Sequence, residues 1–210
     1  PMSTYLDFKN SRTSFGINVM KSIVVEVEAS DGSIGVSTGQ GGAPACYMIE
    51  QHFRRFIVGL DPRDINKAWD QMYRASMYYG GKGLPMWAIS VVDLALWDLL
   101  GVIRNEPVYK MIGGSVRDEI ELYCTGIRPD AAKEPGFIGG KMPLPFAPVD
   151  RHEGLKANVE HFQEMRNKVG SDFWLMADCW MSLDVSYAVE LANAMQDVDL
   201  YWIEEALHPG

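Results

Sequence analysis

Apolar and polar residues alternate weakly near the start of the chain, and this pattern predicts a β-hairpin. Residues 19–28 are rich in β-branched side chains, and residues 33–37 repeat the same alternation. Asp31 and Gly32 stand between the two runs, and Asp-Gly is a strong signal for a tight hairpin turn. We therefore expect two short antiparallel strands.

The apolar residues that follow recur at helical spacing. The helices predicted by this spacing cover residues 46–60, 64–79, 86–102 and 107–111. Asp61-Pro62 separates the first helix from the second. The third is apolar nearly all round, which predicts a buried helix whose Asp93 and Asp98 need partners or positions at its edges, because an unpaired buried carboxylate is costly.

The second half of the chain alternates between short apolar runs and amphipathic segments. The predicted order is strand, strand, helix, strand, helix, strand, over residues 121–125, 137–142, 153–169, 173–177, 183–195 and 200–203. Ser182 or Asp184 is expected to cap the second of these helices. This order is typical of the first part of a parallel α/β barrel or of an open α/β sheet.

Two acids follow the last two strands directly. Asp178 comes after residues 173–177, and Glu204 comes after residues 200–203. Parallel strands joined by one helix are usually neighbours, so both acids are expected at the same carboxyl edge, where α/β folds build active sites. Carboxylates this close repel each other unless a cation such as Mg²⁺ lies between them. The alternative is that both are solvated or capping acids.

Two basic residues are candidates for binding an anionic substrate. Lys141 ends the strand predicted over residues 137–142, so it shares the edge of the two acids and either neutralises them or binds a substrate anion; an ordinary strand-end cation is the alternative. Arg12 lies in a polar N-terminal loop, where it either clamps a carboxylate or remains a solvated charge.

Composition limits the classes of function. With 210 residues, 47% of them hydrophobic, the chain can bury a real core. Nineteen basic residues against 28 acidic ones give a net charge of −9 without a basic cluster, which argues against nucleic acid as a partner. The three cysteines form no CxxC motif, which argues against a disulfide framework and structural zinc. We expect a soluble, cytoplasmic protein without a signal peptide or membrane span.

Two stretches have the pattern of known barrel elements: VVDLALWDLLGVIRNEPVYKMIGG, and DCWMSLDVSYAVELANAM followed by WIEEAL. The first resembles the helix that leads into the barrel, and the second resembles the metal-binding third and fourth strands, of the mandelate-racemase-like branch of the enolase superfamily. The similarity runs across nearly the whole chain. Within the branch, acid-sugar dehydratases resemble the chain most closely, at SRTSFGIN, GFIGGKMP and DFWLMADCWMS.

The resemblance implies a fold and an activity. It implies an α+β capping domain over residues 1–118, lacking its start, and the first half of a modified (β/α) TIM-type barrel over residues 119–210. Family members remove the proton α to a carboxylate and stabilise the ene-diolate on Mg²⁺, and they are commonly homo-oligomers. In this branch, acid-sugar dehydratases are lyases that also expel the 3-hydroxyl of an acid sugar. No nucleic acid or membrane partner is implied.

The resemblance also assigns roles to residues. Asp178 and Glu204 match the first two of three acidic Mg²⁺ ligands, Glu205 is not expected to ligate, and Arg12 matches an arginine that binds substrate from the capping domain.

The chain departs from the family pattern in two respects. It stops after the fourth predicted strand, whereas a barrel has eight, and Gly139-Gly140-Lys141 lacks the K-x-K of members with a lysine base. The third ligand and the histidine base are expected beyond these residues, so no catalytic base is assigned and a fragment of a longer product is expected. The alternatives are a dehydratase for another sugar acid and a truncated, non-catalytic α/β protein that associates with another chain.

Overall fold

The computed structural model describes residues 2–10 and 16–209. These residues form two compact units, one of residues 16–118 and one that groups residues 2–10 with residues 119–209. Residues 112–122, all exposed, connect the two units along the chain. Each unit has its own hydrophobic core, so each is described by itself.

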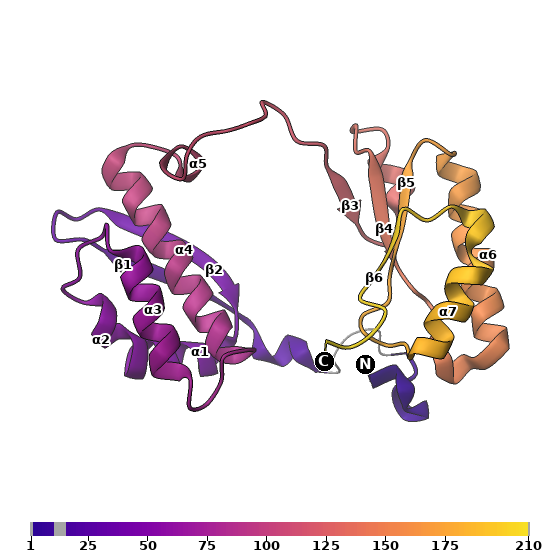
Figure 1. Ribbon diagram of the computed structural model, residues 1–210, viewed down its shortest axis with the longest axis horizontal. Coiled ribbons are helices and arrows are strands. Elements are labelled where there is room, and N and C mark those ends of the chain that lie inside the picture. The colour runs from indigo at the N-terminus through magenta and orange to yellow at the C-terminus, as the bar shows by residue number, and fades with distance from the viewer. Residues whose placement is uncertain (1, 11–15, 210) are drawn as a thin grey trace. The chain divides into compact units, whose positions relative to one another are not determined.

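The unit of residues 16–118 contains the predicted hairpin. Strand β1 (Ser22–Glu28) pairs antiparallel with β2 (Ile34–Gln40), with Ser22 opposite Gln40 and Glu28 opposite Ile34 (Figure 1). At the turn, Asp31 Oδ1 accepts a hydrogen bond from the backbone N–H of Ser33 at 2.9 Å, and Gly32 adopts a positive φ of 86°. The Asp-Gly signal and the hairpin prediction are both confirmed.

Helices make up the rest of this unit. In order they are α1 (Gly42–Met48), a π-helical turn (Ile49–Phe53), α2 (Arg54–Ile57), α3 (Ile65–Ser76), α4 (Leu84–Arg104) and α5 (Val108–Met111). The single helix predicted over residues 46–60 is therefore interrupted by a π-helical turn and ends three residues early. The other helices lie within three residues of their predicted bounds.

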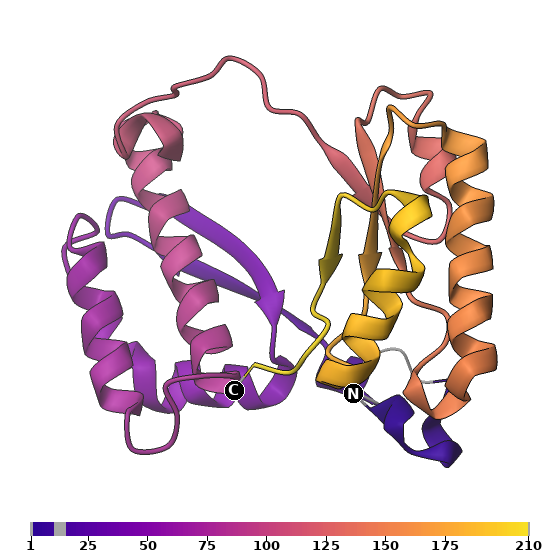
Figure 2. The same cartoon turned by 45° about the vertical axis from the view of Figure 1, so that its right-hand side comes forward.

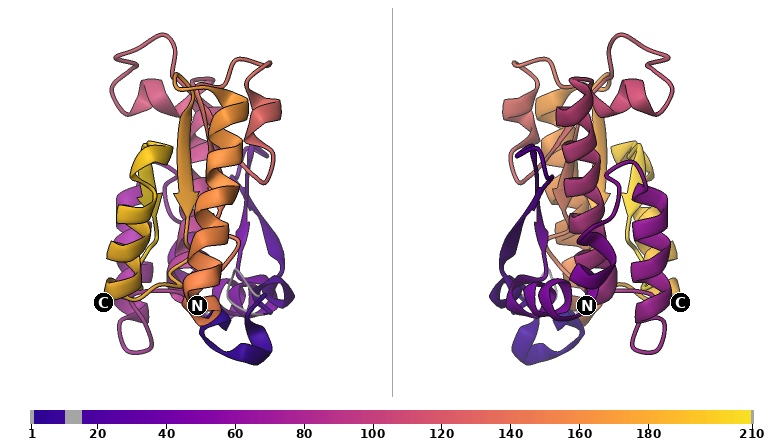
Figure 3. Two further views of the ribbon diagram at one scale, coloured as in Figure 1. Left: turned by 90° about the vertical axis from the view of Figure 1, so that its right-hand side faces the viewer. Right: turned by 90° about the vertical axis from the view of Figure 1, so that its left-hand side faces the viewer.

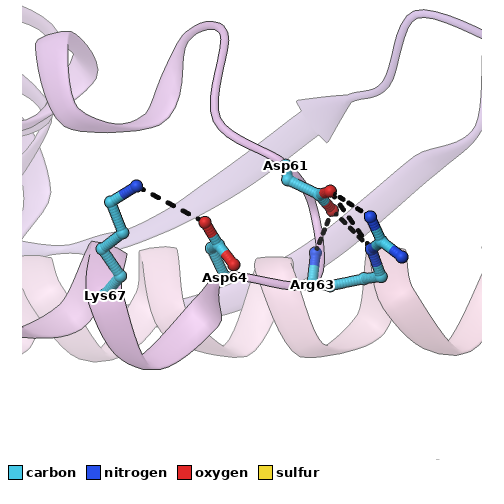
Figure 4. Close-up of polar contacts among 4 residues, drawn as sticks. All are labelled: Asp61, Arg63, Asp64 and Lys67. Carbon is cyan, nitrogen blue, oxygen red and sulfur yellow. Dashed lines mark hydrogen bonds and ion pairs between the residues drawn. The ribbon is translucent and has the colours of Figure 1, made fainter.

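The break between α2 and α3 is held by local ion pairs (Figure 4). The Asp61 carboxylate accepts hydrogen bonds from the backbone N–H and the guanidinium of Arg63, and Asp64 pairs with Lys67 at 3.4 Å. The side-chain hydrogen bond from Arg63 holds the pKa of Asp61 well below its usual range. The predicted Asp61-Pro62 break is thus a turn closed by its own side chains.

The predicted buried helix, α4, is the centre of the first core. Its buried residues pack with the hairpin and with α1 and α3, and β2 approaches it so closely at Gly35 that a Cβ there would lie 2.3 Å from the carbonyl oxygen of Ala95. Among the described residues, α4 is also the one helix with the length and apolarity of a membrane span. Its place in this core accounts for that apolarity.

The other unit is built on a parallel sheet. Its strands are β3 (Tyr123–Thr125), β4 (Gly139–Pro143), β5 (Trp174–Asp178) and β6 (Trp202–Glu204), in the order β3-β4-β5-β6. Helices α6 (Arg151–Val169) and α7 (Val185–Ala194) cover one face of this sheet (Figures 2 and 3). The core between sheet and helices includes Leu175, Ala177, Phe162 and Leu191. The predicted order of elements is confirmed.

Candidate functional site

The carboxyl edge of this sheet brings three of the predicted site residues together. Asp178 and Glu204 are direct partners in the register between β5 and β6, and Lys141 lies one pleat earlier, opposite Met176 on β5. Successive side chains along a strand point to opposite faces of the sheet. Ala177 packs in the core under the helices, so its neighbour Asp178 points to the other face. The three side chains therefore share the face turned away from α6 and α7.

Lys141 lies between the two acids. Its Nζ is 3.2 Å from Asp178 Oδ2 and donates a hydrogen bond to Glu204 Oε1. The side chains of Lys141 and Asp178 are only 9% and 8% exposed, and that of Glu204 is 32% exposed. Burial opposes the charge of the ammonium, but its hydrogen bonds to Glu204 and Asp178 and their negative charges outweigh that cost and raise the pKa of Lys141.

The other oxygen of each carboxylate also has a donor. The backbone N–H of Trp180 donates to Asp178 Oδ1 at 3.1 Å, and the indole Nε1–H of Trp202 donates to Glu204 Oε2 at 3.2 Å. All four oxygens are thus engaged, which fixes how the acids are aimed. The sequence prediction missed Trp202, although its place two residues before Glu204 puts both side chains on one strand face.

The turn after β5 is tightly held and strained. The backbone N–H groups of Cys179 and Met181 donate to the carbonyl oxygens of Glu204 and Glu205, at 2.9 and 2.6 Å. Trp180, Met181 and Glu205 all adopt positive φ, near 50°, a region that non-glycine residues rarely enter. Such strain concentrates at functional sites, because the surrounding structure must sustain it.

Cys179 lies beneath this turn and takes no part in the site. It is 2% exposed within the core. Burial, and to a smaller extent the charge of Asp178, raises the pKa of its thiol to about 12. Cys179 therefore packs in the core as a neutral thiol.

A buried asparagine pins the proline-rich loop after β4. Asn158 on α6 accepts a hydrogen bond from the backbone N–H of Phe146 at 2.9 Å and donates to its carbonyl oxygen at 3.0 Å. Asn158 Nδ2 also reaches the hydroxyl of Tyr187 on α7, at 3.4 Å. The loop is thereby tied to both helices. Asn158 was not among the predicted site residues, since an asparagine inside a helical pattern carries no distinctive signal.

The remaining predicted residues do not enlarge the site. Arg12 lies outside the described residues. Within residues 2–10 and 16–209, no group of three or more His, Cys, Asp or Glu side chains could hold a metal ion. The two carboxylates still suit Mg²⁺ chemically, because this ion prefers oxygen ligands and is often held by one or two carboxylates with water and substrate.

Two family models match the sequence. Residues 8–113 match the model described as the N-terminal domain of mandelate racemase and muconate lactonizing enzyme, and residues 130–210 match the model described as enolase C-terminal domain-like. Together the matches cover most of the chain, one in each half.

The chain is also similar to individual proteins. An L-rhamnonate dehydratase of Saccharopolyspora erythraea is 56% identical over 209 residues, which is 100% of this chain and 54% of that protein. A crystal structure of rhamnonate dehydratase from Gibberella zeae, complexed with Mg, is 57% identical with a TM-score of 0.96, over 100% of this chain and 52% of that one.

A more distant solved structure with similar sequence is that of a racemase. A racemase from Streptomyces coelicolor A3(2) with bound magnesium is 32% identical with a TM-score of 0.79, over 90% of this chain and 55% of that chain. This chain spans about half the length of the curated relative and of these solved chains.

Proposed function

This chain belongs to the mandelate racemase and muconate lactonizing enzyme family of the enolase superfamily, and from that premise we propose that the protein carrying it is a Mg²⁺-dependent acid-sugar dehydratase. The proposed reaction converts L-rhamnonate to 2-keto-3-deoxy-L-rhamnonate. The observation that carries it is the cluster of buried Asp178 and Lys141 with partly exposed Glu204 at one sheet edge, in a chain 56% identical to an L-rhamnonate dehydratase.

The reaction is a dehydration and needs no oxidant or reductant. A base removes the proton from C2, the C3–oxygen bond breaks, the hydroxyl leaves as water, and the resulting enol becomes the 2-keto product. We assign no catalytic base within this chain. When bound, Mg²⁺ supplies the positive charge that makes the proton α to the substrate carboxylate acidic enough to remove.

The chain's own residues have binding roles in this proposal. Asp178 and Glu204 are the metal ligands, aimed by the donors on their second oxygens. Lys141 and Arg12 bind the anionic substrate. Glu205 is not a ligand in this proposal, because it lies beyond the end of β6 in the turn of positive φ, whereas Glu204 is in register with Asp178.

The proposal extends to the whole protein. The unit of residues 16–118 is the capping domain and residues 119–209 belong to the first half of the barrel; residues 2–10, expected in a capping domain of residues 1–118, group with the barrel unit. The protein acts as a cytoplasmic homo-oligomer on a small-molecule acid sugar.

The metal ligand is the part of the proposal to test first. In the protein as its gene encodes it, we expect Asp178→Asn to abolish measurable Mg²⁺ binding by calorimetry and to lower kcat/KM for L-rhamnonate by about 10³-fold or more, since metal catalysis supplies several kcal/mol. Asp172→Asn is the matched control, because Asp172 is exposed at the amino end of β5. Unchanged metal binding and turnover in Asp178→Asn would exclude the proposed site.

The choice of sugar acid needs a separate experiment. A panel of hexonates and pentonates differing at single stereocentres should give L-rhamnonate the highest kcat/KM. If another acid sugar exceeds it tenfold, the reaction class stands and the substrate assignment is wrong.

A further inference from the structure

We propose that Lys141 is an internal counter-ion that a divalent metal displaces, so that the ammonium and the metal occupy Asp178 and Glu204 in turn. The inference rests on the proposed role of these two acids as metal ligands. It goes beyond that role, because Lys141 then weakens metal binding by pairing with the two acids, and leaves them when the metal binds.

The geometry around the ammonium supports this exchange. Nζ contacts one oxygen of each carboxylate, Asp178 Oδ2 and Glu204 Oε1, while the second oxygen of each accepts from a tryptophan N–H. A cation held by both acids would use the two oxygens that face Nζ. The ammonium and the metal therefore compete for the same acceptors.

Burial prevents the ammonium and the metal from binding to the two acids together. The side chains of Lys141 and Asp178 are nearly inaccessible to water, so the repulsion between two cations there is only weakly screened. Metal binding then requires the ammonium to move, and the two ion pairs are lost in the process.

The lysine side chain is suited to such a movement. Lys141 lies one pleat before the strand end, in register with Met176, and it reaches the carboxylates through four methylene groups. A released ammonium remains at the same sheet edge. It is then available to the carboxylate of an acid-sugar substrate, which links the counter-ion role to the proposed substrate contact.

The first test removes the ammonium while keeping an unbranched side chain of similar length. In the full-length protein, Lys141→Met should bind Mg²⁺ at least about tenfold more tightly than wild type by calorimetry, because no ion pairs are broken. Lys156→Met is the control for the change in net charge, since Lys156 forms only an exposed pair with Glu160 at 3.7 Å. Equal or weaker Mg²⁺ binding by Lys141→Met would overturn the exchange.

A second measurement uses unaltered protein, so it stands even if Lys141→Met fails to fold. Reductive methylation followed by mass spectrometry should show slow labelling of Lys141 in EDTA and labelling at least about fivefold faster with saturating Mg²⁺, as the ammonium leaves its partners. Lys156 should label at the same rate in both conditions. A Lys141 rate that Mg²⁺ leaves unchanged would contradict displacement.

The outcomes separate this inference from the proposed function. If Mg²⁺ does not bind wild type, or Asp178→Asn binds it normally, the metal site itself is wrong and the inference fails with it. If Asp178→Asn loses Mg²⁺ but Lys141→Met binds it no more tightly than wild type, the metal site stands and only the counter-ion role fails.

Discussion

The two aspartates of α4 have different surroundings. Asp98 Oδ2 accepts the backbone N–H of Val36 on β2 at 2.8 Å, so this carboxylate joins the hairpin to the helix. Asp93 is half-buried, and burial raises the pKa of its carboxyl group. Both were predicted to be structural because a buried acid in an apolar helix needs a partner or an edge. For Asp98 the partner is the β2 backbone.

Asp93 makes stability depend on pH. The pKa of Asp93 is higher in the folded protein than in the unfolded chain, so folding favours the protonated carboxyl group. Its contribution to the free energy of unfolding is therefore fully present below the unfolded pKa and is lost as pH rises through the folded pKa. At pH 7 the charged carboxylate is therefore a cost. We expect Asp93→Asn to raise the free energy of unfolding at pH 7 by up to about 1 kcal/mol, and to give no gain near pH 3.5.

Amide hydrogen exchange of α4 at the two pH values checks this expectation. Asp98→Asn is the control, because asparagine keeps an acceptor for the Val36 N–H and should change stability little at either pH. Destabilisation by Asp93→Asn at pH 7 would mean that the charged form of Asp93 has a favourable partner.

The positions of the site residues could be predicted from strand ends, but their contacts could not. Asp178, Glu204 and Lys141 were expected at one edge because parallel strands end together, and the register confirms that proximity. Which oxygen faces which donor depends on rotamers and on the strained turn at Trp180. Those details come from packing between strands, which periodicity does not encode.

At the scale of elements, one arginine joins the amino edge of the sheet to its covering helix. Arg166 on α6 is 9% exposed, and its guanidinium donates only to backbone carbonyl oxygens. The acceptors are those of Gly170, Phe173, Val198 and Asp199, at 2.7 to 2.9 Å. The end of α6, the start of β5 and the loop before β6 are therefore held by one side chain.

Removing this guanidinium should weaken the whole unit. We expect Arg166→Met to lower the free energy of unfolding by about 3 kcal/mol, because the methionine fills the stem's space but leaves buried carbonyl groups without donors. Hydrogen exchange of the β5 amides reports on this unit alone.

A matched arginine on the other unit serves as the control. Arg74 pairs with Asp70 at 2.7 Å on the exposed face of α3, so Arg74→Met should change the free energy of unfolding far less than Arg166→Met does. A loss below about 1 kcal/mol in Arg166→Met would show that water replaces the guanidinium.

Most elements could be predicted because their signals are local. The Asp31-Gly32 turn, the Asp61-Pro62 break and the Asp184 cap, which accepts the Tyr187 N–H at 2.8 Å, all act within a few residues. The π-helical turn Ile49–Phe53 could not be predicted, since no glycine or proline interrupts the helical pattern there. Phe53, the last residue of this turn, is fully buried in the core.

At the scale of the whole molecule, the strand order of the parallel sheet could be predicted because short helical connections join consecutive strands. Helix α6 lies between β4 and β5 and helix α7 between β5 and β6, and strands that are neighbours in sequence are neighbours in the sheet. The grouping of residues 2–10 with residues 119–209 is different. It depends on contacts between segments far apart in the chain, for which a single sequence has no periodic signal.

The segment between the two units should be the first to be cut by a protease. Residues 115–121 are exposed and lie outside every helix and strand, and Arg117 is the basic residue within them. Arginines and lysines in α3, α4 and α6 are protected because a protease needs an extended backbone, and opening a helix costs its hydrogen bonds. Within residues 16–209, we therefore expect trypsin to cut first after Arg117.

Intact-mass measurement during brief digestion tests this expectation. The first cut within residues 16–209 should separate residues 16–117 from residues 118–209, each carrying a complete core of its own unit. Arg117→Gln should remove that cut and slow the appearance of both fragments, without altering cleavage inside either unit. If Arg117 resists trypsin while helical sites are cut, residues 115–121 are covered in the native protein, and the linker is a packed element of the fold rather than an open connection.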